Sequence, residues 1–219
     1  MEHLLNDLLP ATVRVAVAPV GDHEDALLPD ERAIVASAVA KRRREFSTGR
    51  VLARRLLAEF DHPEFALLRG EDRVPQWPEG LVGSISHADE LCAAAVGQAS
   101  EFAGIGVDLE PDEAVDREIE RVVCRDGECA WVRAGGDGEV GRRVRVVFSV
   151  KEAVYKAFYP RTREFWGFQD VLVEIDLDAG RYQATLPESA GVRQVNGRVA
   201  LREGWILSTL AVRANEVGA

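Results

Sequence analysis

The sequence lacks the features that mark membrane proteins, secreted proteins and zinc-binding domains. Its 219 residues contain no apolar run of the roughly 18 to 20 residues that a membrane span requires. The N-terminus has no basic leader ahead of a continuous apolar stretch, so we expect no secretory signal. Cysteine is scarce, and Cys92, Cys124 and Cys129 lack paired spacing, which argues against a disulfide framework and a zinc site. We expect a soluble cytoplasmic protein with reduced thiols.

The chain also lacks the overall positive charge of a general nucleic-acid-binding protein. Its net charge is −10, from 37 acidic and 27 basic residues. Nucleic-acid binding usually needs a broadly basic surface, so we expect no nucleic-acid partner, and any anionic ligand must meet a local basic patch. One such patch lies in residues 41–55, KRRREFSTGRVLARR. It fits either a solvated helical face or a site for a phosphorylated ligand.

The hydrophobic pattern predicts helices packed on short, mainly antiparallel strands in both parts of the chain. Its 47% of hydrophobic residues can bury one sizeable core or two small ones. Together these features predict an α+β fold with a seam near residues 98–104. The expected helices span about 29–44, 47–60, 112–123 and 148–158, and the expected strands 12–17, 65–68, 81–86, 91–97, 104–110, 171–176, 181–186, 197–203 and 205–213.

Local signals suggest where the helices begin and end. Pro29 can begin the first helix, because the missing N–H costs little there. Ser47 or Thr48 can cap the second helix. Pro160 is expected to end the helix that begins at Phe148.

The first chemical signal is a pair of carboxylates in Gly104–Glu110, GIGVDLE. Strand alternation places Asp108 and Glu110 on one face together with two glycines, and Ile105, Val107 and Leu109 on the other. Two neighbouring carboxylates are tolerable if they face water or share a cation such as magnesium. The glycines would leave room for a ligand to approach the backbone. A solvated strand edge fits the same pattern.

The second signal lies in Phe148–Phe158, FSVKEAVYKAF. Glu152 and Lys156 are four residues apart and therefore share one helix face, with Lys151 beside Glu152. They could form an ordinary surface ion pair worth about 0.2 to 0.5 kcal/mol. Because the helix is otherwise apolar, its charged residues are more consistent with a narrow polar cleft. A third carboxylate and an ammonium group suit a metal-bound phosphate ester.

The third signal is Trp77–His87, WPEGLVGSISH. His87 could hydrogen-bond or neutralise a phosphate, or it could be structural. Ser84 and Ser86 raise the question of nucleophilic catalysis. Neither lies in a Gly-x-Ser-x-Gly elbow, and no acid partner for a triad is visible, so a hydrolase is disfavoured.

These three segments resemble, in order and separation, the three signature motifs of the Sfp-type 4′-phosphopantetheinyl transferases. Residues 41–54, KRRREFSTGRVLAR, resemble the version found in the actinobacterial and enterobactin-type branch. The resemblance covers most of residues 29–170. It implies two similar α+β halves, 1–103 and 104–219, related by pseudo-twofold symmetry, with coenzyme A in the cleft between them.

The resemblance also implies an activity. Such enzymes transfer the 4′-phosphopantetheine arm of coenzyme A to a serine of an acyl, peptidyl or aryl carrier protein and release 3′,5′-adenosine bisphosphate. Asp108, Glu110 and Glu152 would hold Mg²⁺, with Mn²⁺ as a possible substitute. Lys156 would stabilise charge on the phosphates. We further expect Glu152 to accept the proton of the incoming serine, directly or through water.

Other residues would bind coenzyme A by the same resemblance. Arg42, Arg50 and Arg69 match basic positions that hold the 3′-phosphate and adenine end, and His87 and Lys151 would also contact the donor. Two motif-bearing halves in one chain predict a monomer. Carrier proteins of polyketide, nonribosomal peptide, siderophore or fatty-acid assembly are the expected partners. A docking surface for them is expected among four residues that follow the helix, where Phe165 and Trp166 could equally be core: Arg161, Arg163, Phe165 and Trp166.

Two other functions use the same residues. A magnesium-dependent phosphohydrolase or nucleotidyl transferase would need an activated water or a nucleoside triphosphate site, and the chain has no Gly-x-x-x-x-Gly-Lys-Ser/Thr loop. A non-catalytic regulator that binds coenzyme A or a nucleotide would be expected to lack one of the metal-binding carboxylates, whereas all three are present.

Overall fold

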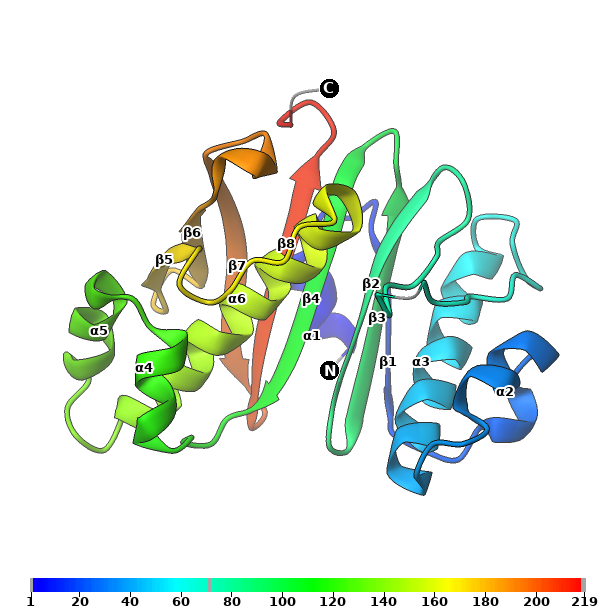
Figure 1. Ribbon diagram of the computed structural model, residues 1–219, viewed down its shortest axis with the longest axis horizontal. Helices are drawn as coiled ribbons and strands as arrows, with labels where there is room; N and C mark the ends of the chain where they lie inside the picture. Colours follow the sequence, from blue (N-terminus) through cyan, green and yellow to red (C-terminus); the bar gives the residue numbers. More distant parts are fainter. Residues whose placement is uncertain (1, 71, 218–219) are drawn as a thin grey trace.

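The computed structural model describes residues 2–70 and 72–217, and it contains two antiparallel sheets that lie side by side, each covered by a long helix (Figure 1). One sheet has the strand order β1-β3-β2, and the other has the order β4-β8-β7-β6-β5. The described strands are β1 (Arg14–Pro19), β2 (Leu81–Ala88), β3 (Leu91–Gln98), β4 (Phe102–Pro111), β5 (Leu172–Asp176), β6 (Arg181–Thr185), β7 (Gln194–Arg202) and β8 (Trp205–Arg213).

The helices are distributed unequally over the two sheets. α3 covers the three-stranded sheet and α6 the five-stranded one, so the halves share a plan but differ in size. The described α-helices are α1 (Glu2–Leu8), α2 (Pro29–Val35), α3 (Ala40–Ala58), α4 (Glu120–Val123), α5 (Asp126–Arg133) and α6 (Val140–Thr162), and the 3-10 turns are η1 (Glu24–Ala26), η2 (Arg117–Ile119) and η3 (Glu188–Ala190). The predicted α+β class is confirmed. Among the described residues, none of the helices combines the length and the apolar character needed to cross a bilayer.

β4 has the two faces that its alternation predicts, but its glycines serve a different purpose. Ile105, Val107 and Leu109 are buried in a core shared with β3 and α1. On the opposite face, a Cβ at Gly104 would lie 2.0 Å from the carbonyl oxygen of Ala157, and one at Gly106 would lie 1.8 Å from that of Ala153. The glycines therefore admit the backbone of α6 and leave no room for a ligand, so that expectation is wrong.

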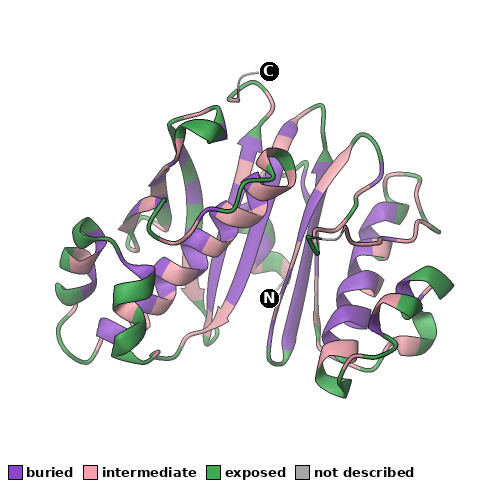
Figure 2. Cartoon of the chain, in the orientation of Figure 1, coloured by how far each residue is buried: buried purple, intermediate pink, exposed green. Residues whose placement is uncertain are grey.

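The two sheets meet where β2 lies along β4. The chain crosses between them at residues 99–101, inside the predicted seam. The Ser84 hydroxyl accepts the backbone N–H of Val107 at 3.0 Å, and the Ser86 hydroxyl accepts that of Leu109 at 3.3 Å. These contacts satisfy backbone groups on the edge strand β4. Figure 2 shows the buried strands β3, β4 and β8 at the centre of the molecule.

Several predicted boundaries are wrong for identifiable reasons. The first helix ends at Val35, and α3 begins at Ala40, so the predicted helix over 29–44 is two helices. Ser47 and Thr48 lie buried inside α3. The Thr48 hydroxyl donates to the carbonyl of Arg44 at 2.8 Å and accepts the N–H of Gly21 at 3.1 Å. It fastens a neighbouring loop to the helix instead of capping it.

The second half shows similar shifts. α6 extends in both directions beyond the predicted 148–158, and Pro160 lies inside its last turn, where the helix is about to end and few hydrogen bonds remain to be lost. The predicted helix over 112–123 is reduced to η2 and α4. Residues 65–68 form no strand, and an isolated bridge between Arg69 and Pro75 follows them.

Candidate active site

A network of hydrogen bonds joins β2, β4 and α6 at the seam. The Lys156 ammonium group donates to Asp108 Oδ1 at 2.6 Å, to Ser86 Oγ at 3.0 Å and to the Val107 carbonyl at 3.3 Å. The Ser86 hydroxyl donates to Asp108 Oδ1 at 3.2 Å. Asp108 is 3% exposed, and its second carboxylate oxygen, Oδ2, is buried without a hydrogen-bond partner. That free oxygen can receive a cation or a donor.

Two further carboxylates lie within electrostatic range of Asp108. Burial, followed by the charge of Asp108, raises the pKa of Glu110 to about 7. Burial is also the main cause of the raised pKa of Glu152, where Asp108 adds to the shift and Lys156 opposes it. Both shifts mean that the folded chain opposes the charged form of these carboxylates, and a bound cation would favour it.

These carboxylates fit a magnesium ion by chemistry but are not already gathered around one position. Carboxylate oxygens are the ligands that magnesium prefers, and it commonly uses one or two of them together with water and substrate phosphate. In the described part of the chain, no three His, Cys, Asp or Glu side chains converge closely enough to hold a metal ion. Binding by all three carboxylates would therefore require some of these side chains to move.

A cavity of about 130 Å³ with mostly basic polar walls lies between α3 and the loop that precedes β2. We call it the basic pocket. Its lining residues are Arg42, Glu45, Phe46, Gly49, Arg50, Arg69, Arg73, Pro75, Ile85 and His87. Arg50 is 5% exposed, lies 4.2 Å from the centre of the Phe46 ring, and has a buried Nε without a hydrogen-bond partner. Burial lowers the pKa of Arg50 to about 10, and the charges of Arg42 and Arg69 add to the effect. An anion would relieve this excess of positive charge.

His87 is attached to the arginines of the basic pocket. Its Nε2 lies 2.7 Å from Arg42 Nη1, and its Nδ1 lies 3.7 Å from Glu45 Oε2. Burial is the main cause of the lowered pKa of His87. Because arginine can only donate, this contact requires the tautomer in which Nε2 carries no proton. His87 thus orients Arg42 and adds no positive charge of its own at neutral pH.

Most of the basic residues of 41–55 fall into two groups, those that line the basic pocket and those that pair with carboxylates outside it. Arg42 and Arg50, the two residues that the resemblance assigns to coenzyme A, both line the basic pocket. Four others are held by carboxylates elsewhere, in the pairs Lys41–Asp89, Arg43–Glu24, Arg54–Glu31 and Arg55–Glu2. Arg73 was not predicted, since it lies in a turn with no periodic pattern that would mark it.

Lys151 was expected to contact coenzyme A, and in the structure its ammonium group is bound by other parts of the chain. Its ammonium group is buried and donates to Glu128 Oε2 at 2.7 Å and to the carbonyls of Val123 and Phe168 at 2.8 and 2.6 Å. Glu128 is 2% exposed and also accepts the backbone N–H of Val173 at 2.7 Å. Three protein acceptors use the three N–H groups of Lys151, so its ammonium group has none left for coenzyme A, although the side chain lines an apolar cavity beside α6.

We expect Lys151→Met to lower the free energy of unfolding by about 3 to 5 kcal/mol, because it leaves the Glu128 carboxylate buried and unpaired. Urea unfolding measures this loss. Lys41→Met removes an exposed ion pair and should leave stability nearly unchanged. Below its melting temperature, Lys151→Met should keep the KM for coenzyme A of the unaltered protein. A raised KM with normal stability would show that the Lys151 ammonium group contacts coenzyme A.

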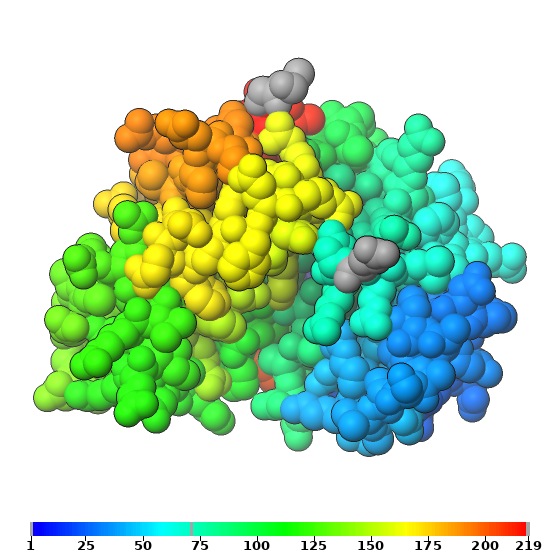
Figure 3. Space-filling view, in the orientation of Figure 1, coloured from blue at the N-terminus to red at the C-terminus, as the bar shows by residue number. Residues whose placement is uncertain are grey.

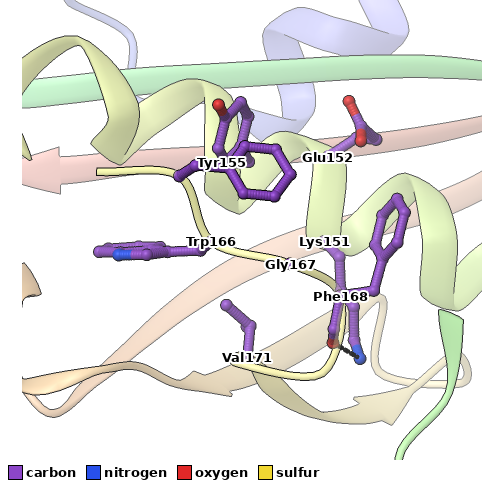
Figure 4. A pocket seen from close by; sticks show the side chains of 8 residues that line it. Lys151, Glu152, Tyr155, Trp166, Gly167, Phe168 and Val171 are labelled. Carbon is purple, nitrogen blue, oxygen red and sulfur yellow. Dashed lines mark hydrogen bonds between the residues drawn. The ribbon is translucent and has the colours of Figure 1, made fainter. Parts of the chain in front are cut away.

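An apolar cavity of about 210 Å³ opens between α6 and the segment that follows it (Figure 4). Its lining residues are Lys151, Glu152, Tyr155, Phe165, Trp166, Gly167, Phe168 and Val171. Figure 4 shows the Glu152 carboxylate and the Lys151 ammonium group pointing to opposite sides of α6. Trp166 is 8% exposed and Phe165 is 80% exposed. Trp166 is therefore part of the packed wall, and Phe165 lies on the surface.

The carboxylates Asp108, Glu110 and Glu152 and the ammonium group of Lys156 form what we call the carboxylate and lysine cluster. Together with the basic pocket and the apolar cavity, it suits an enzyme that transfers a phosphorylated, partly apolar group. A family model described as "4'-phosphopantetheinyl transferase N-terminal domain" matches residues 30–97, and one described as "4'-phosphopantetheinyl transferase superfamily" matches residues 104–209. The chain belongs to the 4′-phosphopantetheinyl transferase superfamily.

Curated relatives agree with this assignment. The chain is 37% identical to 4′-phosphopantetheinyl transferase Svp of Streptomyces mobaraensis, over 88% of this chain and 81% of that protein. It is 30% identical to Npt of Nocardia iowensis, over 95% of this chain and 99% of the relative. It is 29% identical to PptT of Mycobacterium tuberculosis, over 95% of this chain and 98% of that protein. The predicted family and enzyme class are confirmed: the chain is a transferase that moves 4′-phosphopantetheine from coenzyme A to a carrier protein.

Proposed function

We propose that one coenzyme A molecule spans the basic pocket and the carboxylate and lysine cluster. Arg42, Arg50 and Arg69 hold its 3′-phosphate and adenine end, with His87 orienting Arg42. Lys156 holds the pyrophosphate end. The observation that carries this assignment is the buried, unpartnered Nε of Arg50 inside a pocket lined by three further arginines. A buried N–H without a hydrogen-bond partner is costly, and a phosphate oxygen would accept a hydrogen bond from it.

The apolar cavity completes the donor site. Glu152 lies on its wall together with Tyr155 and Trp166. Pantetheine is a long, weakly polar arm, and it suits a cavity of this lining. The buried indole Nε1 of Trp166 has no hydrogen-bond partner, so it is available to an amide oxygen of that arm. Binding there leaves the pyrophosphate close to Glu152.

The residues support a direct displacement. The serine oxygen of the carrier protein forms a bond to the phosphorus that bears pantetheine, and the bond from this phosphorus to the bridging oxygen breaks. The electron pair leaves with 3′,5′-adenosine bisphosphate, and Glu152 accepts the serine proton. Burial raises the pKa of Glu152 above its ordinary value, which makes it a stronger base than an exposed glutamate. Lys156 stabilises the negative charge on the phosphate oxygens.

Asp108, Glu110 and Glu152 are the residues that would hold Mg²⁺ or Mn²⁺. The buried, unpartnered Oδ2 of Asp108 supports this role, as do the raised pKa values of Glu110 and Glu152. A divalent cation at this position would neutralise charge on the pyrophosphate. Lys156 contacts Asp108 Oδ1, so it would share this carboxylate with the cation, and the lysine and the metal site would be coupled.

The decisive experiment combines the protein, coenzyme A, Mg²⁺ and an apo carrier protein. Mass spectrometry should show the carrier gaining one phosphopantetheine group, and EDTA should prevent the gain. Carriers from fatty-acid, polyketide, nonribosomal peptide and siderophore assembly should be compared under the same conditions. Failure to modify any of them would contradict the proposed function.

We further propose that the chain acts as a cytoplasmic monomer without a nucleic-acid partner. The basic pocket and the carboxylates both come from one chain, which supports the monomer. We retain 1–103 and 104–219 as its two halves, with one qualification. α1 packs on β1 and also on β7 and β8 of the other sheet. The N-terminal half therefore includes a helix that packs against the sheets of both halves.

A further inference from the structure

The loop that connects α3 to β2 carries two of the arginines that line the basic pocket. Arg69 lies at one side of this loop, and Arg73 lies near its tip. Neither residue belongs to a helix or a strand that would fix its position. The geometry of the basic pocket therefore depends on the contacts that hold the loop.

The described part of the loop is a tight turn with a strained residue. The Gly70 N–H donates to the Val74 carbonyl at 3.0 Å, and the Arg73 N–H donates to the Gly70 carbonyl at 2.9 Å. Arg73 has a φ of 69°, in the left-handed region. A side chain other than glycine in that region costs free energy, and the conformation persists only where neighbouring contacts hold it.

Asp72 supplies those contacts. Its Oδ1 accepts the backbone N–H of Val74 at 3.2 Å, and its Oδ2 accepts a hydrogen bond from Nη1 of Arg163. Gly70 leaves space for this arrangement, because a Cβ there would lie 2.7 Å from Asp72 Oδ1. One carboxylate thus closes the turn and reaches a residue 91 positions away.

Arg163 is attached to the helix that carries the proposed catalytic residues. It is the left-handed C-cap of α6, and its N–H donates to the Tyr159 carbonyl at 2.9 Å. Glu152 and Lys156 lie on the same helix. In Figure 3 the yellow segment at the end of α6 and the cyan segment around residue 70 lie side by side between the two halves of the molecule.

We propose that Asp72 and Arg163 are positioning residues that hold Arg69 and Arg73, the two loop arginines of the basic pocket, at a fixed distance from Asp108, Glu152 and Lys156. The inference rests on the proposed function, because coenzyme A must place its 3′-phosphate and its pyrophosphate in both sites at once. The Arg163 side chain is 56% exposed and that of Asp72 is 26% exposed. Exposed ion pairs add little to stability, so the expected effect is on binding of the donor.

Two substitutions separate the ion pair from the turn. Asp72→Asn keeps an oxygen for the Val74 N–H and removes the charge, and Arg163→Gln removes the opposite charge. Each should raise the KM for coenzyme A about 5-fold to 10-fold, with kcat within about twofold and an unchanged melting temperature. The double variant should raise KM no further than either single variant, because both remove one interaction. With dephospho-coenzyme A, which lacks the 3′-phosphate, all variants should match the unaltered protein.

Arg117→Gln provides a matched control, since it breaks an exposed arginine–aspartate pair, 3.5 Å from Asp137, on the five-stranded half. It should match the unaltered protein with both donors. Additive effects in the double variant, an equal rise with dephospho-coenzyme A, or an unchanged KM for coenzyme A would each overturn the positioning role. A separate measurement tests the proposed function independently of the positioning role. If the unaltered protein fails to bind coenzyme A in calorimetry, the proposed function is wrong.

Discussion

Glu152→Gln should reduce kcat for carrier modification by about 100-fold or more, while the KM for coenzyme A stays within about threefold. The amide retains the size of the carboxylate and cannot accept the serine proton. It also weakens one proposed ligand of the cation. Single-turnover measurement of holo carrier protein, by mass spectrometry, gives the rate of the chemical step without product release.

Glu164→Gln is the matched control for this substitution. Glu164 is exposed and lies just beyond the end of α6, so its loss should leave both kcat and KM unchanged. If Glu152→Gln retained near-normal kcat, Glu152 would be excluded as the base. A large rise in KM with normal kcat would instead assign it to binding of the donor.

Removal of divalent cations should lower turnover by at least about 100-fold, and either Mg²⁺ or Mn²⁺ should restore it. The physical reason is the charge of the proposed site, where the pyrophosphate would lie beside Asp108 and its neighbouring carboxylates. Lys156 is the cation in direct contact with Asp108. Dialysis against EDTA, followed by titration with each metal, measures the requirement. Asp108→Asn should raise the metal concentration needed for half-maximal rate.

Binding of 3′,5′-adenosine bisphosphate offers an internal control for the chelation experiment. Its 3′-phosphate should still bind at Arg50 and Arg42 after EDTA treatment, because no carboxylate of the metal site lines the basic pocket. Full turnover of metal-free enzyme would contradict the role given to the three carboxylates. Loss of all nucleotide binding in EDTA would show that the two sites are not separable as proposed.

The alternation of β4 could be read from sequence because strand geometry is periodic. Ile105 and Val107 are buried as that period requires, and Asp108 lies on the opposite face with its oxygen near Lys156. The role of the glycines could not be read in the same way. A gap without side chains fits a ligand or a helix equally well, and only the position of the Ala153 carbonyl decides between them.

Partners distant in sequence account for the remaining errors. Lys151 and Lys156 look alike in the motif, yet the first is held by Glu128 in a helix that sequence patterning did not predict. The basic run likewise gives no sign that Arg54 pairs with the fully buried Glu31 while Arg50 lacks a partner for its Nε. The family resemblance singled out Arg42 and Arg50, which both line the basic pocket, whereas charge alone could not have separated them from the rest of the run; their contact with the 3′-phosphate stays a prediction.

The serine contacts between β2 and β4 also constrain how the gene can be recombined. A chimaera with its crossover at residues 99–101 takes Ser84 and Ser86 from one parent and Val107, Leu109 and the helix carrying the lysine from the other. Both hydroxyls must meet backbone groups in the correct register, and one of them must also meet the lysine. Parents that differ in the offset between these strands should therefore yield inactive recombinants, however similar their separate cores are.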